Sequence, residues 1–296
     1  MTSVTILDGG MGKELLRIGA PFAQPEWSAL ALLEEPTWVL AAHNNFIDAG
    51  AEIIITNTYA VVPPHIGAER FAARGAELAE LAASIARQAA DEADRPILVA
   101  GSLPPLFESY SPENFNADEA PALYEVLVTA QLPHVDVWLG ETISSLAEYE
   151  AVRDAVAHTG MDLWVAFTVD DDVDPGVARL RSGESMADMV KAVRDDVSTI
   201  MINCSQPERF DDALREVFAA LGDNPEGIVV GAYANAFVDK ETGYASNEVV
   251  LEHRGDLTPE RYVEFVQGWV DMGVSIVGGC CGITPDHIEA LDDEFG

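Results

Sequence analysis

TIMINCSQPERFDDALREVFAALGDNPEGIVVGA, residues 199–232, is the stretch that decides the fold class. It opens with a short apolar run at 199–203, continues with a helix-compatible segment at 208–221, and closes with a second apolar run at 227–232. Apolar strands that alternate with helices indicate a parallel sheet whose strands are buried on both faces. The stretch therefore predicts one strand–helix–strand unit of an α/β fold.

The same alternation extends along the whole chain. Eight short apolar or β-branched runs are expected to be strands: 4–8, 52–56, 97–101, 135–140, 163–169, 199–203, 227–232 and 274–278. Amphipathic or Ala-rich segments lie between them, such as 75–92, 142–157, 185–197, 208–221 and 259–272. Eight such units in 296 residues favour a closed (β/α)8 barrel over an open sheet. No repeat or linker divides the chain, so we predict a single TIM-type barrel domain over residues 1–296.

The charge balance is strongly acidic, with 51 Asp and Glu against 16 Lys and Arg and a formal net charge of −35. Such a field repels nucleic acid and anionic lipid, so neither is an expected partner. It disfavours an acidic substrate at long range and attracts a cationic one. Because the acidic residues are spread along the sequence, we interpret them as a solvated surface adapted to high salt, where screening removes the self-repulsion.

The first residues, 1–8, lack a basic segment followed by a long apolar run, so they read as a first strand and not as a signal peptide. No run of about 18 residues is apolar enough to span a membrane. We therefore expect a soluble cytoplasmic protein. The chain has three cysteines, two of them adjacent, which in a reducing compartment favours metal binding or catalysis over a disulfide framework.

Polar residues and glycines cluster just after the predicted strands, at the face of such a barrel where active sites lie. These residues include Asp8, Gly9, Gly10, Ser102, Glu141, Cys204, Asn235, Cys280 and Cys281. All three cysteines are thus expected on one rim. The predicted sixth and eighth strands, which precede them, are two apart around the barrel, so the thiols can converge across its mouth.

Three thiolates on one rim suit Zn²⁺, whose catalytic sites combine three protein ligands with one open position. A substrate thiol that enters the open position loses its proton on coordination. A single cysteine is more often a small buried apolar side chain. Here two adjacent cysteines follow a double glycine, and a third lies at another strand end. This combination favours metal binding over a buried apolar role. Cys204, Cys280 and Cys281 are therefore the predicted metal ligands and catalytic residues.

Several motifs resemble the homocysteine S-methyltransferase family, which includes betaine–homocysteine and S-methylmethionine–homocysteine methyltransferases. The resemblance runs almost end to end, through LDGGMG at 7–12, WSA at 27–29, TNTY at 56–59, Glu141-Thr142, Asn203-Cys204 and GGCCGITPDHI at 278–288. It implies that Cys204, Cys280 and Cys281 bind zinc. It also implies that Asp8 and Glu141 bind the ammonium group of homocysteine.

An amino-acid substrate also needs donors for its carboxylate, and glycine-rich rims supply backbone N–H groups. Gly9, Gly10 and the region of Ser102 are the candidates. Asn235 resembles a family residue near the metal, either capping the zinc or forming a turn. For Asp8 the alternative is a strand-end cap, and for Glu141 a structural ion pair.

Three further residues have less specific readings. Trp27 either lines the donor pocket or packs beneath a loop. His43 and His287 occupy helix-like positions and are expected to be structural.

The stretch 103–112, LPPLFESYSP, departs from the Gly-Pro-Tyr-Gly type of segment that the resemblance leads us to expect. Loops at this rim shape the donor pocket, so the donor stays open. An onium compound, S-methylmethionine or S-adenosylmethionine, is favoured because it suits the negative field and leaves as a neutral group. The expected reaction is methyl transfer from this donor to homocysteine, giving methionine.

Three alternatives stay open. One is a related thiol or selenol methyltransferase. Another is a non-catalytic zinc- or thiol-binding barrel that works with a separate corrinoid protein. A third is a barrel enzyme of unrelated chemistry with a phosphate site at Gly278-Gly279, which the acidic field and the lack of nearby basic residues disfavour.

Overall fold

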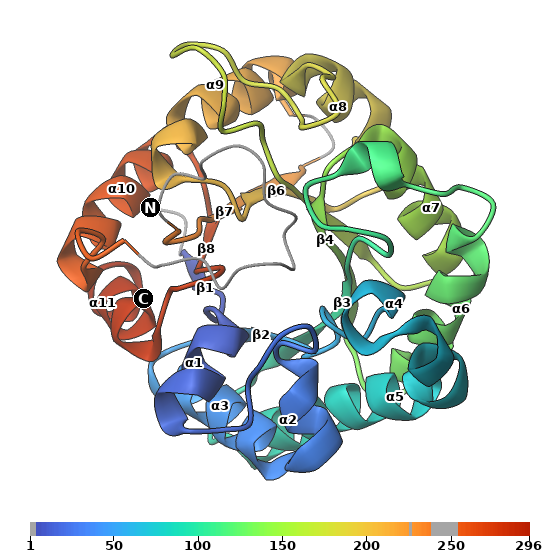
Figure 1. Ribbon diagram of the computed structural model, residues 1–296. Coiled ribbons are helices and arrows are strands. Elements are labelled where there is room, and N and C mark those ends of the chain that lie inside the picture. Colours follow the sequence, from blue (N-terminus) through green and yellow to red (C-terminus); the bar gives the residue numbers. More distant parts are fainter. Residues whose placement is uncertain (1–3, 225–226, 238–253) are drawn as a thin grey trace.

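Eight parallel strands form one sheet that curls into a barrel, as predicted. The computed structural model describes residues 4–224, 227–237 and 254–296. The strand order is β1-β8-β7-β6-β5-β4-β3-β2, and a bridge between Leu7 and Ile53 joins the two end strands. Figure 1 shows the ring of strands surrounded by helices. The strands are β1 (Thr5–Ile6), β2 (Ile53–Ile55), β3 (Leu98–Leu103), β4 (Val137–Ile143), β5 (Leu163–Phe167), β6 (Thr199–Asn203), β7 (Val229–Tyr233) and β8 (Ile276–Val277).

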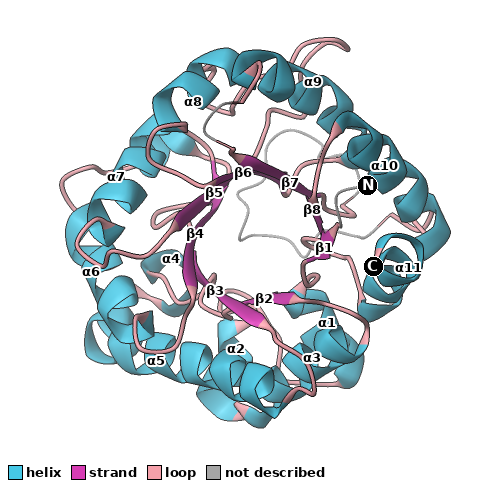
Figure 2. Ribbon diagram, turned by 180° about the vertical axis from the view of Figure 1, so that it is seen from behind, coloured by secondary structure: helices cyan, strands magenta, loops and turns pink. Residues whose placement is uncertain are grey.

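The helices cover the outside of the strands, and the view from behind shows the same arrangement (Figure 2). The α-helices are α1 (Met11–Ile18), α2 (Ala29–Glu34), α3 (Thr37–Asp48), α4 (Pro63–Ile66), α5 (Ala68–Glu92), α6 (Ala120–Gln131), α7 (Leu146–Val156), α8 (Met186–Val193), α9 (Phe210–Leu221), α10 (Pro259–Met272) and α11 (Pro285–Phe295). Two short 3₁₀ helices, Pro112–Asn114 and Pro207–Arg209, precede α6 and α9. All five predicted helical segments overlap a helix of the structure.

The predicted bounds of every strand except β6 differ from the structure, and the early ends predicted for β3 and β4 affect the site. β3 continues to Leu103 and β4 to Ile143, so Ser102, Glu141 and Thr142 lie within strands and not after them. The register between β4 and β5 shifts between Gly140 and Ile143, and Thr142 has a φ of 59°. This irregularity lets polar residues sit inside a buried strand, where an unbroken apolar pattern would have been expected.

Side chains fill the barrel interior below the rim. The inner cluster contains apolar residues from all eight strands or their flanks, such as Leu7, Leu139, Met201 and Tyr233. Gly231 makes room for this packing, because a Cβ there would lie 2.5 Å from Met201 Cγ. Among the described residues, no helix is long and apolar enough to cross a membrane. The packed interior leaves the strand ends and the loops after them as the place for a site.

Candidate metal and substrate site

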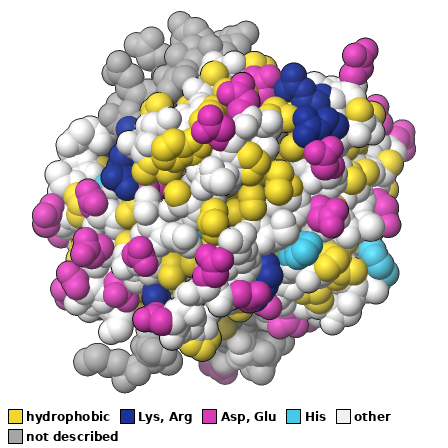
Figure 3. Space-filling view, turned by 90° about the horizontal axis from the view of Figure 1, so that it is seen from below, with side chains coloured by type: hydrophobic (Ala, Val, Ile, Leu, Met, Phe, Trp, Pro, Cys, Tyr) yellow, Lys and Arg dark blue, Asp and Glu magenta, His cyan; other side chains and the backbone are white. Residues whose placement is uncertain are grey.

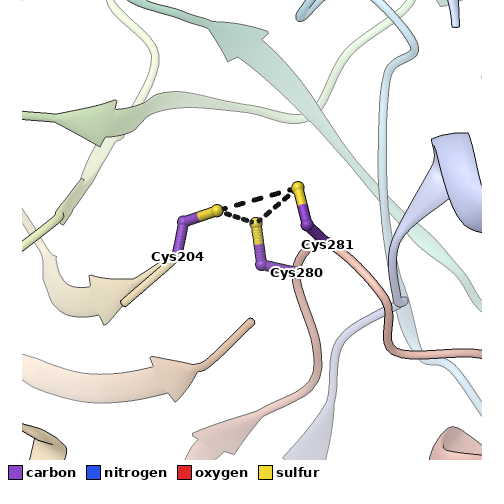
Figure 4. Close-up of side chains that lie close together, drawn as sticks. All are labelled: Cys204, Cys280 and Cys281. Atoms are coloured by element: carbon purple, nitrogen blue, oxygen red, sulfur yellow. Dashed lines mark hydrogen bonds between the residues drawn. The ribbon is translucent and has the colours of Figure 1, made fainter. Parts of the chain in front are cut away.

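The three thiols converge at the mouth of the barrel. Cys204 follows β6, whereas Cys280 and Cys281 follow β8, and Figure 4 shows the three side chains directed toward one another. The Sγ atom of Cys204 lies 2.6 Å from that of Cys280 and 3.9 Å from that of Cys281. The Sγ atoms of Cys280 and Cys281 are 4.0 Å apart. The predicted convergence of the sixth and eighth strand ends is therefore confirmed.

Cys204 is held in a strained position by its neighbours. Its φ is 48°, in the left-handed region that few residues other than glycine adopt. Its backbone N–H donates to Tyr233 O (3.1 Å), and its carbonyl accepts from Asn235 Nδ2 (2.8 Å). The Tyr110 hydroxyl lies 3.0 Å from its Sγ atom. These contacts fix the thiol toward the other two sulfurs.

Glycines allow the loop after β1 to pack directly on the loop that carries the paired cysteines. A Cβ on Gly10 would lie 2.6 Å from Cys280 O, and one on Gly279 would lie 2.1 Å from Ile283 Cγ2. Gly10 N–H donates to Ile283 O over 2.8 Å. Because of this close approach, Asp8 and the sulfurs face the same cavity.

Two buried carboxylates stand beside the thiols. Asp8 is 2% exposed, and one of its oxygens accepts from Ile55 N–H (2.8 Å). Its other oxygen, Oδ1, is buried with no hydrogen-bond partner among the described residues. Glu141 is 7% exposed and accepts from Ser102 Oγ over 2.8 Å. Both side chains line the cavity, which leaves an unsatisfied acceptor for a ligand to fill.

Both carboxylates hold protons more tightly than usual. Burial raises the pKa of Asp8 well above its ordinary value, and the charge of Glu141 raises it further, although the Ile55 N–H opposes the shift. Burial likewise raises the pKa of Glu141 to about 7, against the hydrogen bond from Ser102. A cationic group between the two would stabilise both ionised forms.

The three thiols differ in how readily they ionise. Burial works to raise the pKa of Cys204, but hydrogen bonds with Cys280, Cys281 and Tyr110 hold it well below the usual value. The bond to Cys204 is the largest cause of the raised pKa of Cys280 and of Cys281, and burial adds to it. The cluster alone therefore favours one thiolate, and ionising all three sulfurs requires a cation among them.

The match to known proteins covers nearly the whole chain. The family model described as homocysteine S-methyltransferase matches residues 5–295. The chain belongs to the homocysteine S-methyltransferase family. This finding confirms the resemblance and the predicted class of reaction, S-methyl transfer to homocysteine.

Individual relatives agree with this assignment. The chain is 29% identical to homocysteine S-methyltransferase 3 of Arabidopsis thaliana, over 97% of this chain and 88% of the relative. It is 28% identical to selenocysteine Se-methyltransferase of Brassica oleracea var. italica, over 97% of this chain and 87% of the relative. The metallated form of the homocysteine methyltransferase MmuM from Escherichia coli superimposes with a TM-score of 0.78 at 25% identity, over 98% of this chain and 96% of that one.

In this member of the family, the site opens into a cavity of about 160 Å³. Its floor carries the thiols and the two carboxylates, and its walls carry aromatic side chains. Trp27 lines the cavity and also packs edge-on against Phe22, with ring centroids 6.0 Å apart, whereas its contact with a methyl donor stays a prediction. The lining comprises residues from several rim loops: Asp8, Gly9, Gly10, Met11, Gly12, Lys13, Leu16, Phe22, Trp27, Ser28, Ile55, Thr56, Asn57, Tyr59, Ala60, His65, Ser109, Tyr110, Glu141, Cys204, Phe237, Gly279, Cys280, Cys281 and Gly282.

The remaining predicted binding residues play different parts. Gly9 and Gly10 line the cavity, but the Gly10 N–H is already bonded to Ile283 O. Ser102 and Asn235 are buried behind the cavity lining. Ser102 donates to Glu141, and its N–H donates to Thr56 Oγ1 (2.9 Å). Asn235 holds the Cys204 carbonyl and accepts from Phe237 N–H (3.2 Å), which places it in a turn. Direct substrate contact by these residues stays a prediction.

The histidines expected to be structural lie outside the cavity lining. His43 is buried on α3, and burial lowers its pKa to about 4. His287 belongs to the capping box of α11 and lies 3.0 Å from Leu257 O. The structure adds residues that the sequence did not point to, above all Tyr110 beside Cys204 and His65 in the cavity wall. Tyr110 comes from the divergent segment 103–112, whose position over the thiols depends on the fold.

Proposed function

We propose that this chain transfers a methyl group from an onium donor, with S-methylmethionine or S-adenosylmethionine favoured, to homocysteine, giving methionine. The observation that carries the proposal is the joint placement of three convergent thiols and two buried carboxylates on one cavity. The thiols suit the sulfur of the acceptor, and the carboxylates suit its ammonium group. Homocysteine combines both groups in one small molecule.

The three sulfurs fit zinc, which is the metal we infer for Cys204, Cys280 and Cys281. Zinc–sulfur bonds of about 2.3 Å in a tetrahedron place sulfurs about 3.8 Å apart. The separations of 3.9 and 4.0 Å agree with this spacing, whereas the pair at 2.6 Å would open by about 1 Å. Bound zinc supplies the charge that ionises a substrate thiol at neutral pH.

The chain's own residues orient the acceptor. Asp8 Oδ1 and Glu141 accept from its ammonium group, since both face the cavity and Asp8 Oδ1 has no other partner among the described residues. The first-turn N–H groups of α1, at Met11 and Gly12, are placed to donate to its carboxylate, because both residues line the same cavity.

The proposed reaction is a direct displacement. The acceptor thiol loses its proton to solvent, and its sulfur forms a bond to the donor methyl carbon. The bond from that carbon to the donor sulfonium breaks, and its electron pair stays on the donor sulfur. The donor leaves as a neutral thioether, so the step needs no general acid. Positioning of the two substrates in one water-poor cavity supplies part of the rate enhancement.

A selenol acceptor is the second candidate. The specific observation in its favour is that the selenocysteine Se-methyltransferase of Brassica oleracea var. italica and homocysteine S-methyltransferase 3 of Arabidopsis thaliana match this chain at 28% and 29% identity. A selenol is more acidic than a thiol and uses the same two carboxylates. Parallel assays with homocysteine and selenocysteine distinguish the two acceptors through their kcat/KM.

The proposal is tested by metal content together with product formation. We expect about one zinc per chain in reduced protein, loss of that zinc in Cys280→Ala, and retention in Ser84→Ala on α5, a control outside the cavity lining. Wild-type protein with homocysteine and a donor panel should yield methionine. Zinc without product from any donor would favour the non-catalytic barrel that works with a corrinoid protein. Reduced protein without zinc would refute the metal assignment.

We also infer a reducing, cytoplasmic location and a single domain over 1–296. The three cysteines are free thiols, which persist in reducing compartments. Elements from β1 to α11 contribute to the one barrel, and the family model spans 5–295.

A further inference from the structure

Lys13 brings a cationic side chain to a cavity whose other charged lining residues are the carboxylates Asp8 and Glu141. It lies in the first turns of α1, and Gly12 and Leu16 of the same helix also line the cavity. Residues three and four apart share one face of a helix, so this face of α1 forms the cavity wall. Among the described lining residues, Lys13 is the one lysine or arginine.

The ammonium group of Lys13 is available to a ligand. No ion pair or side-chain hydrogen bond joins it to the part of the chain that the structure describes. This is unexpected in a chain with 51 acidic residues. Arginines near the site are occupied: Arg17 pairs with Glu14 at 2.6 Å, and Arg181 pairs with Asp171 at 2.6 Å. A cation that faces a cavity and lacks such a partner is suited to an anionic group of a ligand.

Lys13 lies near the loop that carries the paired cysteines, and both line the same cavity. Gly10, at the start of α1, abuts Cys280, and Lys13 lies one turn further along the helix. Three residues of helix rise about 4.5 Å, so Lys13 lies one helical turn beyond the residue that contacts the Cys280 backbone. Asp8 and Glu141, which we assign to the acceptor's ammonium, are buried, whereas Lys13 is partly exposed. The outer position of Lys13 therefore suits the second substrate.

The wall beside Lys13 suits a positively charged centre. Phe22 packs on α1, because a Cβ on Gly12 would lie 3.0 Å from its ring. The ring centroid of Phe22 lies 6.0 Å from that of Trp27, which in turn lies 6.2 Å from that of His65. Aromatic faces attract onium groups through their quadrupoles. A ligand with its onium centre against this wall and its carboxylate at Lys13 is a zwitterion.

We propose that Lys13 binds the carboxylate of the methyl donor and thereby selects onium donors that carry one. This inference rests on the proposed methyl transfer and names the class of its second substrate. It separates S-methylmethionine, glycine betaine and S-adenosylmethionine, which carry a carboxylate, from choline-type donors and methylated corrinoids. Lys13 does not contact the reacting atoms and acts as a specificity-determining residue.

The test compares each accepted donor with its methyl ester, which keeps the onium group and lacks the charge. We expect wild-type kcat/KM to favour the free carboxylate by roughly 10- to 100-fold, as for a charge-assisted hydrogen bond. Lys13→Met should bring this ratio close to one, and Lys13→Arg should retain most of it. Lys191→Met removes the same charge from an exposed position on α8 and should keep the wild-type ratio.

Three results would overturn the inference. The first is an unchanged ratio of kcat/KM between donor and ester in Lys13→Met. The second is a raised KM for homocysteine, and not for the donor, in this variant. The third is a preference of wild-type protein for a donor without a carboxylate. Failure of the proposed function itself looks different, since wild-type protein would then form no methionine with any donor.

Discussion

Glu141 is buried beside a second carboxylate, Asp8, and both hold their protons more tightly than an exposed carboxyl group. Such a pair is costly without a cation, because each charge lies in a poorly solvated site near the other. We propose that the ammonium group of the acceptor supplies this cation. The same reasoning links substrate affinity to pH, since only ionised carboxylates bind the ammonium strongly.

We expect the affinity for methionine to fall as pH decreases through 7. Methionine carries the ammonium of the acceptor but no thiol, so ionisation of a substrate thiol does not contribute to the pH dependence of its binding. The pKa of Glu141 is about 7 in the ligand-free protein, so a proton competes with the ammonium below that pH and is absent at pH 8. Calorimetric titration at pH 6, 7 and 8 should show a Kd that rises by up to about tenfold per pH unit below 7.

Glu141→Gln provides the matched comparison. Loss of the charge should weaken binding at pH 8 by about 2 kcal/mol or more, roughly 30-fold in Kd. The dependence on pH should become shallower, with a residual slope from Asp8. An unchanged Kd in this variant would remove Glu141 from the substrate site.

At the scale of elements, two glycine-rich loops bring Asp8 and the paired cysteines together. Gly279 sits so close to Ile283 that a side chain has no space, with 2.1 Å from its ideal Cβ to Ile283 Cγ2. We expect Gly279→Ala to destabilise the protein by about 2 kcal/mol or more and to lower its zinc content, because the cysteine loop must move. Gly268→Ala on α10 is the control, since nothing lies within 4 Å of its ideal Cβ.

The control should be neutral or slightly stabilising, because alanine is favoured over glycine within a helix by roughly 0.5–1 kcal/mol. Thermal unfolding and zinc analysis of both variants give the comparison. If Gly279→Ala keeps its full zinc content and wild-type stability, the close packing of the two loops is not what forms the site.

These elements also show how far the sequence determines the prediction. Strands buried on both faces leave continuous apolar runs, so the eight strands were predicted correctly. The ends of β3 and β4 were predicted too early, because Ser102 and Glu141 are polar residues inside strands. Polar residues usually indicate a loop. The cysteines were found because their residue type is rare and their positions follow strands. The contact of Tyr110 with Cys204 joins residues 94 apart in the chain, a relation that local patterns do not contain.

At the scale of the whole molecule, the net charge of −35 dominates. Figure 3 shows Asp and Glu side chains scattered over one face, with few Lys or Arg among them. Many arginines are already paired, as in the contacts of Arg70 with Glu26 and of Arg74 with Glu77. The excess carboxylates therefore repel one another, and this repulsion favours expansion of the chain.

Added salt should therefore stabilise the fold. The Debye length falls from about 10 Å at 0.1 M to about 3 Å at 1 M, which removes repulsion between carboxylates that are not direct neighbours. If screening contributes about 3–5 kcal/mol, the Tm should rise on the order of 10 °C between 0.1 and 2 M KCl. Scanning calorimetry should show one cooperative transition throughout, as expected for a single barrel domain. NaCl at equal ionic strength should act equally, since screening does not depend on the identity of the cation. A Tm that is flat or falls with KCl would contradict the high-salt interpretation, and two separate transitions would contradict the single domain.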